Sequence, residues 1–346
     1  MPNDKTINKW KECFNERGLD ERFFQSYLEY IKSLSSQNLP IIFETEHLSL
    51  LLGRNPSYLD SVTFSPKSHY RDFKLKKRSG GYRKIDVPYP ALLECQYWIY
   101  ENILSKIKLH YCAHGFAKKK SIVTNAKTHL HQRVLLKIDL ENFFPSIRKN
   151  RVIEMFYRFG YPSNVAFYLA SICCLDECLP QGAPTSPAIS NIIAIKLDNR
   201  ILAFAKKFKL KYTRYADDLA ISGEKLPVKF IDYITTIIED ENFKVNTSKT
   251  QLHNKKGKRI LTGISIGSDK LKAPKEYKRK LFQEIYYINK FGLYSHVTRE
   301  KIRNPYYLNS IIGKLNYVLN IEPDNKKALD FRNQFINIEK TSTNDK

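Results

Sequence analysis

The stretch YTRYADDLAIS, residues 212–222, places two adjacent acids between two short apolar runs. Tyr212, Leu219 and Ile221 flank the acids, which predicts two strands of a buried sheet joined by a tight turn at Asp217 and Asp218. Adjacent carboxylates repel each other, and a divalent cation would remove that repulsion. The pair is therefore a candidate metal site, with a turn of solvated acids as the simplest alternative.

A third acid ends another predicted strand. The run VLLKID, residues 134–139, is mainly apolar up to Asp139 and is soon followed by Phe143-Phe144-Pro145. Phosphoryl transfer by two metal ions, about 3.5–4 Å apart, needs carboxylates from separate chain segments to bridge the ions. Asp139 together with the Asp217-Asp218 turn predicts such a centre, although a lone acid after a strand is also a common helix or turn cap.

A glycine- and proline-containing loop separates these two strands along the chain. It reads LPQGAPTSPAISN, residues 179–191. Gly182 would let the backbone approach a ligand closely, and a helix N-terminus behind it would favour phosphate. Thr185-Ser186-Pro187 predicts the start of that helix, with a hydroxyl cap and an early proline, and the helix is expected to run to about Phe208. An ordinary loop-to-helix transition is the alternative.

Further upstream, RDFKLKKRSGGYRKID at residues 71–86 predicts a β-hairpin with a basic face. Phe73 and Leu75 alternate with lysines, and Ser79-Gly80-Gly81 supplies the turn. Helices and strands are mixed along the chain without strict alternation. This order favours an α+β fold over a doubly wound sheet.

The net positive charge of the chain predicts a polyanionic binding partner. Lys plus Arg number 58 against 35 Asp plus Glu, a formal net charge of +23, and basic residues on phosphates release condensed counterions. A membrane is not the expected partner, because no stretch approaches the ~20 apolar residues of a bilayer span. The six cysteines are scattered rather than arranged as a disulfide framework, which indicates a reducing cytoplasm.

The order of these elements resembles reverse transcriptases: a basic hairpin, Asp139, Gln181-Gly182, the Asp217-Asp218 turn, Lys249 and a Thr262-Gly263 hairpin. The resemblance covers roughly residues 70–267 and implies a right-hand polymerase fold, with fingers, a palm built on a small antiparallel sheet, and a helical thumb. The implied divisions are an N-terminal helical region (1–60), fingers (61–133), palm (134–267, with finger-side helices 150–178) and thumb (268–346).

The same resemblance implies roles for individual residues in a polymerase that uses dNTPs. Asp139, Asp217 and Asp218 would hold two Mg²⁺ ions, with Mn²⁺ as an alternative, and Phe144 would be the steric gate against a ribose 2′-OH. The other expected contacts lie around the incoming nucleotide: Lys76 and Arg83 on the triphosphate, Gln181 and Gly182 near the templating pair, and Lys249 as the acid for pyrophosphate. Core packing for Phe144 and a solvated lysine for Lys249 are the alternatives.

A narrower resemblance is to bacterial retron reverse transcriptases. Residues 125–129 read NAKTH, similar to the retron NAxxH signature, and ILTGI at 260–264 is similar to the retron VTG motif. The resemblance implies a structured noncoding RNA as template and primer, DNA synthesis from a guanosine 2′-OH, a branched RNA-linked product and an effector protein in phage defence. Asn125 and His129 become candidate RNA contacts, with a surface histidine as the alternative for His129.

The last part of the chain is helical, basic and rich in tyrosine. Within Tyr277–Asn337, Lys278, Arg279 and Lys280 are the candidate RNA contacts, and a solvated helical bundle is the alternative. The residues after the Thr262-Gly263 hairpin suffice for a thumb and leave no room for an RNase H domain. Template removal is therefore expected to need a host RNase H.

Three other functions remain open at this point. An intron or diversity-generating reverse transcriptase would share the palm residues. A non-catalytic RNA-binding scaffold would not need all three acids. A metal nuclease would leave the basic hairpin and Phe144 without a role.

Overall fold

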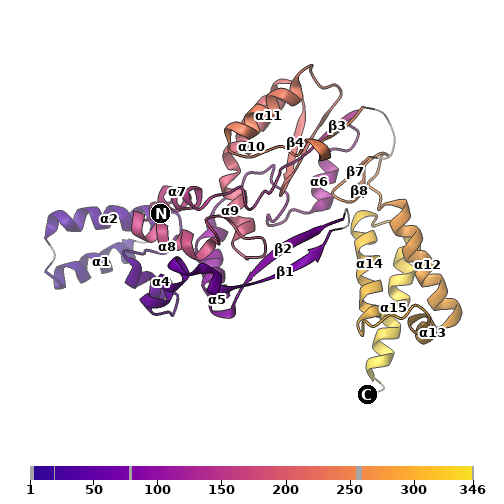
Figure 1. Cartoon of the computed structure of the whole chain (residues 1–346), viewed down its shortest axis with the longest axis horizontal. Coiled ribbons are helices and arrows are strands. Elements are labelled where there is room, and N and C mark those ends of the chain that lie inside the picture. The colour runs from indigo at the N-terminus through magenta and orange to yellow at the C-terminus, as the bar shows by residue number, and fades with distance from the viewer. Residues whose placement is uncertain (1–3, 19, 78–79, 255–258, 345–346) are drawn as a thin grey trace. The chain divides into compact units, whose positions relative to one another are not determined.

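The chain divides into two compact units, which are described separately. The computed structural model describes residues 4–18, 20–77, 80–254 and 259–344 (Figure 1). Unit 1 consists of residues 1–116, 140–201 and 231–246, and unit 2 of residues 117–139, 202–230 and 247–346. Each unit is thus assembled from three separate stretches of the chain.

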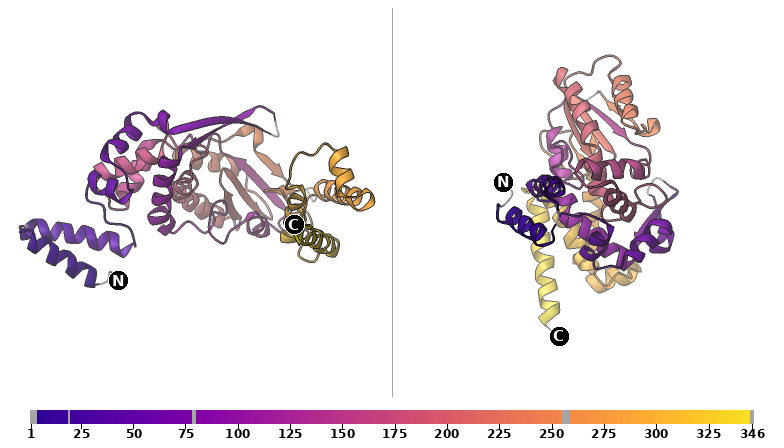
Figure 2. Two further views of the ribbon diagram at one scale, coloured as in Figure 1. Left: turned by 90° about the horizontal axis from the view of Figure 1, so that it is seen from below. Right: turned by 90° about the vertical axis from the view of Figure 1, so that its left-hand side faces the viewer.

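Unit 1 is mainly helical. Its helices are α1 (Asp4–Glu16), α2 (Glu21–Ser36), α3 (Thr45–Leu51), α4 (Pro56–Phe64), α5 (Pro90–Asn102), α7 (Lys149–Arg158), α8 (Ser163–Cys173), α9 (Ser186–Ile193) and, from its second residue, α11 (Phe230–Asp240). Helix α10 (Ile195–Lys207) begins in unit 1 and ends in unit 2. Helices α1 and α2 lie side by side (Figures 1 and 2). They share an apolar cluster.

The basic hairpin predicted over residues 71–86 is confirmed. Strands β1 (Tyr70–Lys76) and β2 (Tyr82–Pro88) pair antiparallel, with Phe73 opposite Ile85 (Figure 1). Gly80 and Gly81 have positive φ angles of 90° and 74°, which suits glycine in the connecting turn. Ser79, the other predicted turn residue, lies outside the described residues.

The helix predicted from Thr185 to Phe208 is two helices, and its expected cap is wrong. Thr185 already has a helical backbone and makes no side-chain cap hydrogen bond. The neighbouring Ser186 uses its hydroxyl instead to donate to the carbonyl of Pro180 at 2.8 Å, which ties the loop back onto itself. The first helix, α9, then ends at Ile193 and α10 begins at Ile195.

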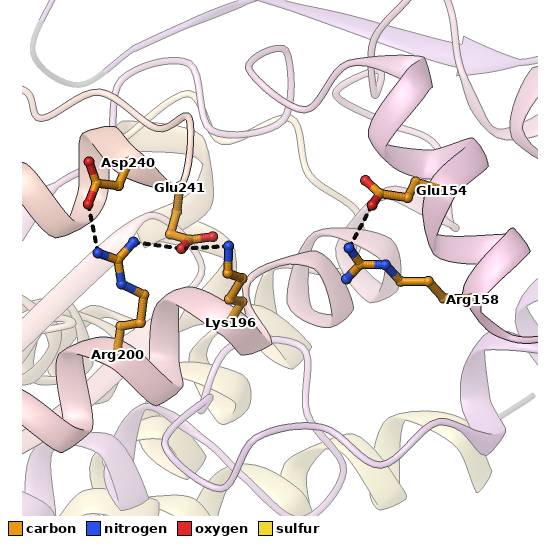
Figure 3. A network of polar contacts seen from close by, with 6 residues as sticks. All are labelled: Glu154, Arg158, Lys196, Arg200, Asp240 and Glu241. Carbon is orange, nitrogen blue, oxygen red and sulfur yellow. Dashed lines mark hydrogen bonds and ion pairs between the residues drawn. The ribbon is translucent and has the colours of Figure 1, made fainter.

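Ion pairs connect α10 to the end of α11 (Figure 3). Arg200 donates to Asp240 at 2.6 Å and to Glu241 at 2.7 Å, while Lys196 lies 3.2 Å from Glu241. Burial raises the pKa of Glu241, but the hydrogen bonds from Arg200 and Lys196 outweigh it and leave the pKa below its ordinary value. Because Glu241 is buried and bonded twice, this cluster orders the α10–α11 region more than an exposed pair would.

Unit 2 combines a sheet with a helical bundle. Its remaining elements are α6 (Ile122–Thr128), β3 (Val134–Asp139), β4 (Lys211–Tyr215), β5 (Asp218–Gly223), β6 (Gln251–His253), β7 (Ile260–Leu261), β8 (Ile264–Ser265), α12 (Lys275–Phe291), α13 (Leu293–Arg299), α14 (Tyr307–Ile321) and α15 (Lys326–Asn344). The strands β4-β5-β3-β6 form one antiparallel sheet in that order, and β7 pairs with β8. Helices beside an antiparallel sheet confirm the α+β class.

One apolar core joins the sheet to the bundle in unit 2. It includes Ala126 of α6, Leu135 and Ala220 of the sheet, and residues of α12, α14 and α15 such as Leu281 and Leu315. The core runs from the sheet through α6 and the β7–β8 hairpin, which supplies Leu261 and Ile264, to the bundle. Across the parts of the chain that the structure describes, no helix is both long and apolar enough to cross a bilayer.

Candidate active site

Two of the three predicted metal ligands face each other across neighbouring strands. Asp139 ends β3, Asp218 begins β5, and the register pairs them directly. Directly opposed residues of antiparallel strands have Cβ atoms about 4.5–5.5 Å apart. Both carboxylates therefore extend from the same face of the sheet.

Asp217 lies in the two-residue turn between β4 and β5. Tyr215 pairs with Asp218, so Ala216 and Asp217 form the loop. Ala216 has a φ angle of +56°, a conformation that normally takes glycine and is strained for other residues. The fully buried Arg214 donates to the carbonyl of Ala216 at 3.2 Å and supports this turn from within the protein.

Asp218 binds its proton more tightly than an ordinary aspartate. The pKa of Asp218 rises from 3.8 to about 6, mainly because the side chain is buried and then because Asp217 and Asp139 lie nearby. Lys137 and Lys249 oppose this rise. A bound cation would offset the cost of this buried negative charge and so favour the ionised form of Asp218.

Lys249, in the short 3₁₀ turn Thr247–Lys249, is the basic member of the site. Its ammonium donates to both oxygens of Asp139, at 2.8 and 3.1 Å, and this hydrogen bond raises the pKa of Lys249. The structure thus brings together all four residues that were predicted to be catalytic: Asp139, Asp217, Asp218 and Lys249.

The donor set suits a hard divalent cation. Carboxylate oxygens are the ligands that Mg²⁺ prefers, usually one or two carboxylates completed by substrate phosphates and water. In the described ranges, no three His, Cys, Asp or Glu side chains are grouped as a ready-made metal site. Asp139 instead binds Lys249. A metal ion bound at this site would therefore have to replace part of the contact between Asp139 and Lys249.

The raised pKa of Asp218 gives a stability prediction for the metal-free protein. Because the folded-state pKa lies above the unfolded value, the folded state holds the proton more tightly, and stability should fall as pH rises from 3.8 to about 6. Asp218→Asn should remove this loss and unfold at a higher temperature than the wild type at pH 7.5 in EDTA. The unfolding temperatures of wild type and Asp218→Asn at pH 4.5 and 7.5 measure this difference. An Asp324→Asn variant, changed at an exposed position, is the control.

Phe144, the predicted steric gate, lies in unit 1 within an aromatic cluster. Its ring is 5.6 Å from that of the buried Phe143 and 6.3 Å from that of the exposed Phe116. Phe143 in turn stacks on Phe243 at 5.6 Å. Phe143 is thus the packing residue, while Phe144 remains partly exposed at the edge of the cluster.

The Gln181-Gly182 loop is bonded to the hairpin strand β2. Asp86 N donates to Gln181 O at 2.9 Å, and a Cβ atom on Gly182 would come within 2.5 Å of Asp86 O. Gly182 also has a φ angle of +137°. Glycine is therefore required for the loop to approach β2, in addition to any approach to a ligand.

The structure does not bring Lys76 and Arg83 together. Lys76 pairs with Tyr82, so Arg83, one residue later, projects from the opposite face of the hairpin together with Leu75. This follows from the two-residue period of a strand. Both basic side chains are exposed, but the register directs them to different sides.

Asn125 and His129 lie inside unit 2. Their exposed fractions are 1% and 0%. His129 bridges two strands, with Nδ1 2.6 Å from Ser222 Oγ and Nε2 2.7 Å from Thr213 Oγ1. Thr213 Oγ1 donates to Asn125 Oδ1 at 2.5 Å. Direct contact with RNA, which the sequence predicted for these two residues, does not fit side chains held in the interior, and neither does a surface histidine.

The three predicted basic contacts on α12 separate into two groups. Lys278 is half-buried and donates to both oxygens of Glu322, at 2.7 and 2.9 Å. Arg279 and Lys280 are exposed. Lys278 therefore holds α12 to the end of α14, and the other two remain accessible to a ligand.

Sequence reasoning missed several residues that build this site. Thr213 and Ser222 are buried hydroxyl residues directly next to the apolar, buried Tyr212 and Ile221, and each bonds to His129. Such hydroxyl residues within a predicted buried strand could have indicated a buried hydrogen-bond partner. The hydrogen bond from the Tyr317 hydroxyl to Gly263 O at 3.0 Å had no such signal, because tyrosines are frequent throughout the last part of the chain.

Comparison with known proteins agrees with this geometry. The family model described as "Reverse transcriptase (RNA-dependent DNA polymerase)" matches residues 75–272, which contain all three acids and Lys249. The chain belongs to the reverse transcriptase family.

Its relatives include the retron Ec86 reverse transcriptase of Escherichia coli, 33% identical over 266 residues, or 75% of this chain and 83% of that protein. The retron Mx162 and Mx65 reverse transcriptases of Myxococcus xanthus are 32% and 31% identical, over 66% and 75% of this chain and 54% and 68% of those proteins.

The chain is therefore an RNA-directed DNA polymerase of the retron type, and the predicted right-hand polymerase fold is confirmed. Enzymes of this reverse transcriptase family generally depend on a divalent metal and copy an RNA template. The opposed carboxylates of β3 and β5 are the part of this chain that suits such chemistry.

Proposed function

We propose that this reverse transcriptase copies a structured noncoding RNA into single-stranded DNA that stays linked to the RNA through a branch at a guanosine 2′-OH. The observation that carries the chemistry is the convergence of Asp139, Asp217 and Asp218 with Lys249 in unit 2. The names of its relatives support the retron product. An effector protein in phage defence and a host RNase H are further proposed partners.

The three acids would hold two Mg²⁺ ions, with Mn²⁺ as an alternative. When bound, such ions lower the pKa of the attacking hydroxyl and stabilise the leaving pyrophosphate. Lys249 would release Asp139 and donate a proton to the pyrophosphate. Its hydrogen bond to Asp139 keeps that proton in place until the exchange.

Phe144, Gln181 and Gly182 would select the nucleotide. Phe144 would contact the sugar, and Gln181 and Gly182 would lie near the templating pair, held there by the bond to β2. Because Lys76 and Arg83 lie on opposite faces of the hairpin, we propose that they have different partners. One would contact the triphosphate and the other the template backbone.

An exposed stripe on α12 is the proposed RNA contact of the thumb. Its members face away from the apolar core of the bundle: Arg279, Lys280, Tyr286, Tyr287, Lys290 and Phe291. Lys290 lies over the rings of Tyr286 and Phe291 at 5.7 and 5.3 Å. Aromatic rings interleaved with basic groups suit unpaired bases, which stack on rings while phosphates meet the cations.

The proposed product gives a direct test. The purified chain is incubated with RNA transcribed from the segment next to its own gene, dNTPs and Mg²⁺. We expect DNA that keeps an RNA nucleotide after RNase digestion and loses it to a 2′–5′ debranching enzyme. DNA that starts only from 3′-OH primers would contradict the retron product while leaving the polymerase intact.

The choice of RNA is expected to depend on residues Tyr277–Asn337. Exchanging this segment for that of the Ec86 relative should transfer priming to the other enzyme's RNA, because the α12 stripe moves with it. Initial rates on both RNAs measure the preference. Exchange of residues 1–60 is the control and should transfer nothing. A preference that stays with the palm after the thumb exchange would place the RNA contacts elsewhere.

The proposal also includes the division into an N-terminal helical region, fingers, palm and thumb, with boundaries at residues 60, 133 and 267. It further places the protein in the cytoplasm. Sparse, free cysteines support a reducing compartment: Cys95, Cys112, Cys173 and Cys174 are buried thiols.

A further inference from the structure

A buried chain of hydrogen bonds continues from the sheet to the β7–β8 turn. His129 contacts Thr213 and Ser222, and Thr213 donates to Asn125. Asn125 Nδ2 then donates to Thr262 Oγ1 at 3.3 Å. Four elements of unit 2 are thereby joined: α6 with the residue that caps it, β4, β5 and the hairpin turn.

The hydrogen atoms of this chain fit one arrangement. Thr213 has a single hydroxyl hydrogen, which goes to Asn125 Oδ1, so Thr213 must accept from His129 Nε2. In a neutral ring Nδ1 then accepts from the Ser222 hydroxyl. Each contact has one donor and one acceptor, which makes the network a defined clamp rather than a loose polar cavity.

Thr262 is held in a conformation that threonine rarely adopts. Its φ angle is +45° and that of Gly263 is +80°, as in a turn that ordinarily takes Asn-Gly. A β-branched residue with positive φ is strained and persists only where its surroundings hold it. The hydroxyl bonded to Asn125 gives a reason for threonine at this position.

The other side of the same turn is held by the bundle. Tyr317 of α14 donates its hydroxyl to Gly263 O at 3.0 Å, and its ring packs edge-on against Tyr277 of α12 at 5.0 Å. The turn is thus bonded to α6 and the sheet through Thr262, and to the bundle through Gly263. It is a joint between the two parts of unit 2.

This joint lies on the face of the sheet that carries the acids. Asp218, Ala220 and Ser222 alternate onto one face of β5, with Asp139 opposite Asp218. Ser222 is four residues from Asp218, or about 13 Å along the strand. The clamp therefore holds one end of this sheet face, and the carboxylates lie at the other end of the same face.

We propose that Asn125, His129 and Thr262 are positioning residues that fix the α12–α15 bundle to the catalytic sheet. Through this joint, the bundle keeps the RNA–DNA duplex aligned with the acids over successive additions. This rests on the proposed function and deepens it, because it assigns the NAKTH and Thr262-Gly263 motifs to processive synthesis rather than to RNA contact.

The test measures processivity as product length and separates the effect of backbone strain at Thr262 from the effect of its hydroxyl group. Full-length enzyme extends a DNA primer on an RNA template with a heparin trap, so that each molecule binds once. Thr262→Gly removes the strain and the hydroxyl together. We expect unchanged thermal stability and single-nucleotide kcat but products shortened roughly fivefold, the factor that one lost hydrogen bond gives.

Matched variants sharpen the result. Thr262→Ser keeps the hydroxyl and should retain wild-type product length. Tyr317→Phe should shorten products as Thr262→Gly does, and the double variant should fall short of the summed effects because both act on one turn. Thr236→Val on α11, which loses an exposed hydroxyl bonded within its own helix, is the control.

Wild-type product length in Thr262→Gly would overturn the inference, as would a loss that only follows a lower unfolding temperature. A wild-type enzyme that adds no nucleotide to the primer would overturn the proposed function instead. The two failures are therefore distinguishable in the same assay.

Discussion

Replacing Asp217 and Asp218 together with asparagine is expected to abolish DNA synthesis while RNA binding persists. The two carboxylates and Asp139 share one edge of the sheet, and the pKa of Asp218 is raised to about 6 by burial and by its acidic neighbours. Asparagine keeps the shape but cannot supply the negative charge that holds a divalent cation. We expect Mg²⁺-dependent dNTP incorporation to fall by at least about a thousandfold, as when groups that stabilise transition-state charge are lost.

RNA affinity is the internal control for this variant. It should come from basic side chains within the net charge of +23 and weaken steeply with salt. Removing two acids should leave it unchanged or slightly increased. Asp240→Asn, which removes an acid from the Arg200 ion pair in unit 1, should keep polymerase activity. Primer extension by the double variant would falsify the assignment of the metal ligands.

Replacing Phe144 with alanine is expected to admit ribonucleotides. Discrimination by a steric gate is a clash built against the wrong substrate, so its removal helps rNTPs far more than it harms dNTPs. Phe144 fits this role because its ring is partly exposed, whereas the adjacent Phe143 is buried against Phe243. The dNTP-to-rNTP ratio of kcat/KM should fall by at least about tenfold, corresponding to about 1.4 kcal/mol.

Two controls separate a gate from a packing residue. Phe64→Ala removes a ring that is 74% exposed in unit 1 and should leave the ratio unchanged. Phe144→Val should act like alanine if the ring edge makes the clash. A folded Phe144→Ala enzyme with an unaltered ratio would identify Phe144 as a core residue, with its contacts to Phe143 and Phe116 as its whole role.

The clamp at Thr262 shows why some functional residues escape sequence reasoning. The motif NAKTH was visible, but its first and last residues, Asn125 and His129, were expected at an RNA surface. Their burial became apparent only when α6 was packed on the strands, because the partners Thr213, Ser222 and Thr262 lie 88, 93 and 137 residues away from the residues they bond. Hydrogen bonds across such separations depend on tertiary packing, which no local pattern encodes.

The sequence alone determined the features that arise from short-range patterns. Period-two alternation predicted the 71–86 hairpin, and apolar runs ending in acids predicted β3 and the β4–β5 turn. These hold because neighbouring residues set strand faces and turns. The tertiary structure decided which acids face each other, that Lys249 bonds to Asp139, that Lys76 and Arg83 diverge, and that His129 is interior. Each of these depends on strand register or on contacts between distant segments, which form only when the whole core is packed.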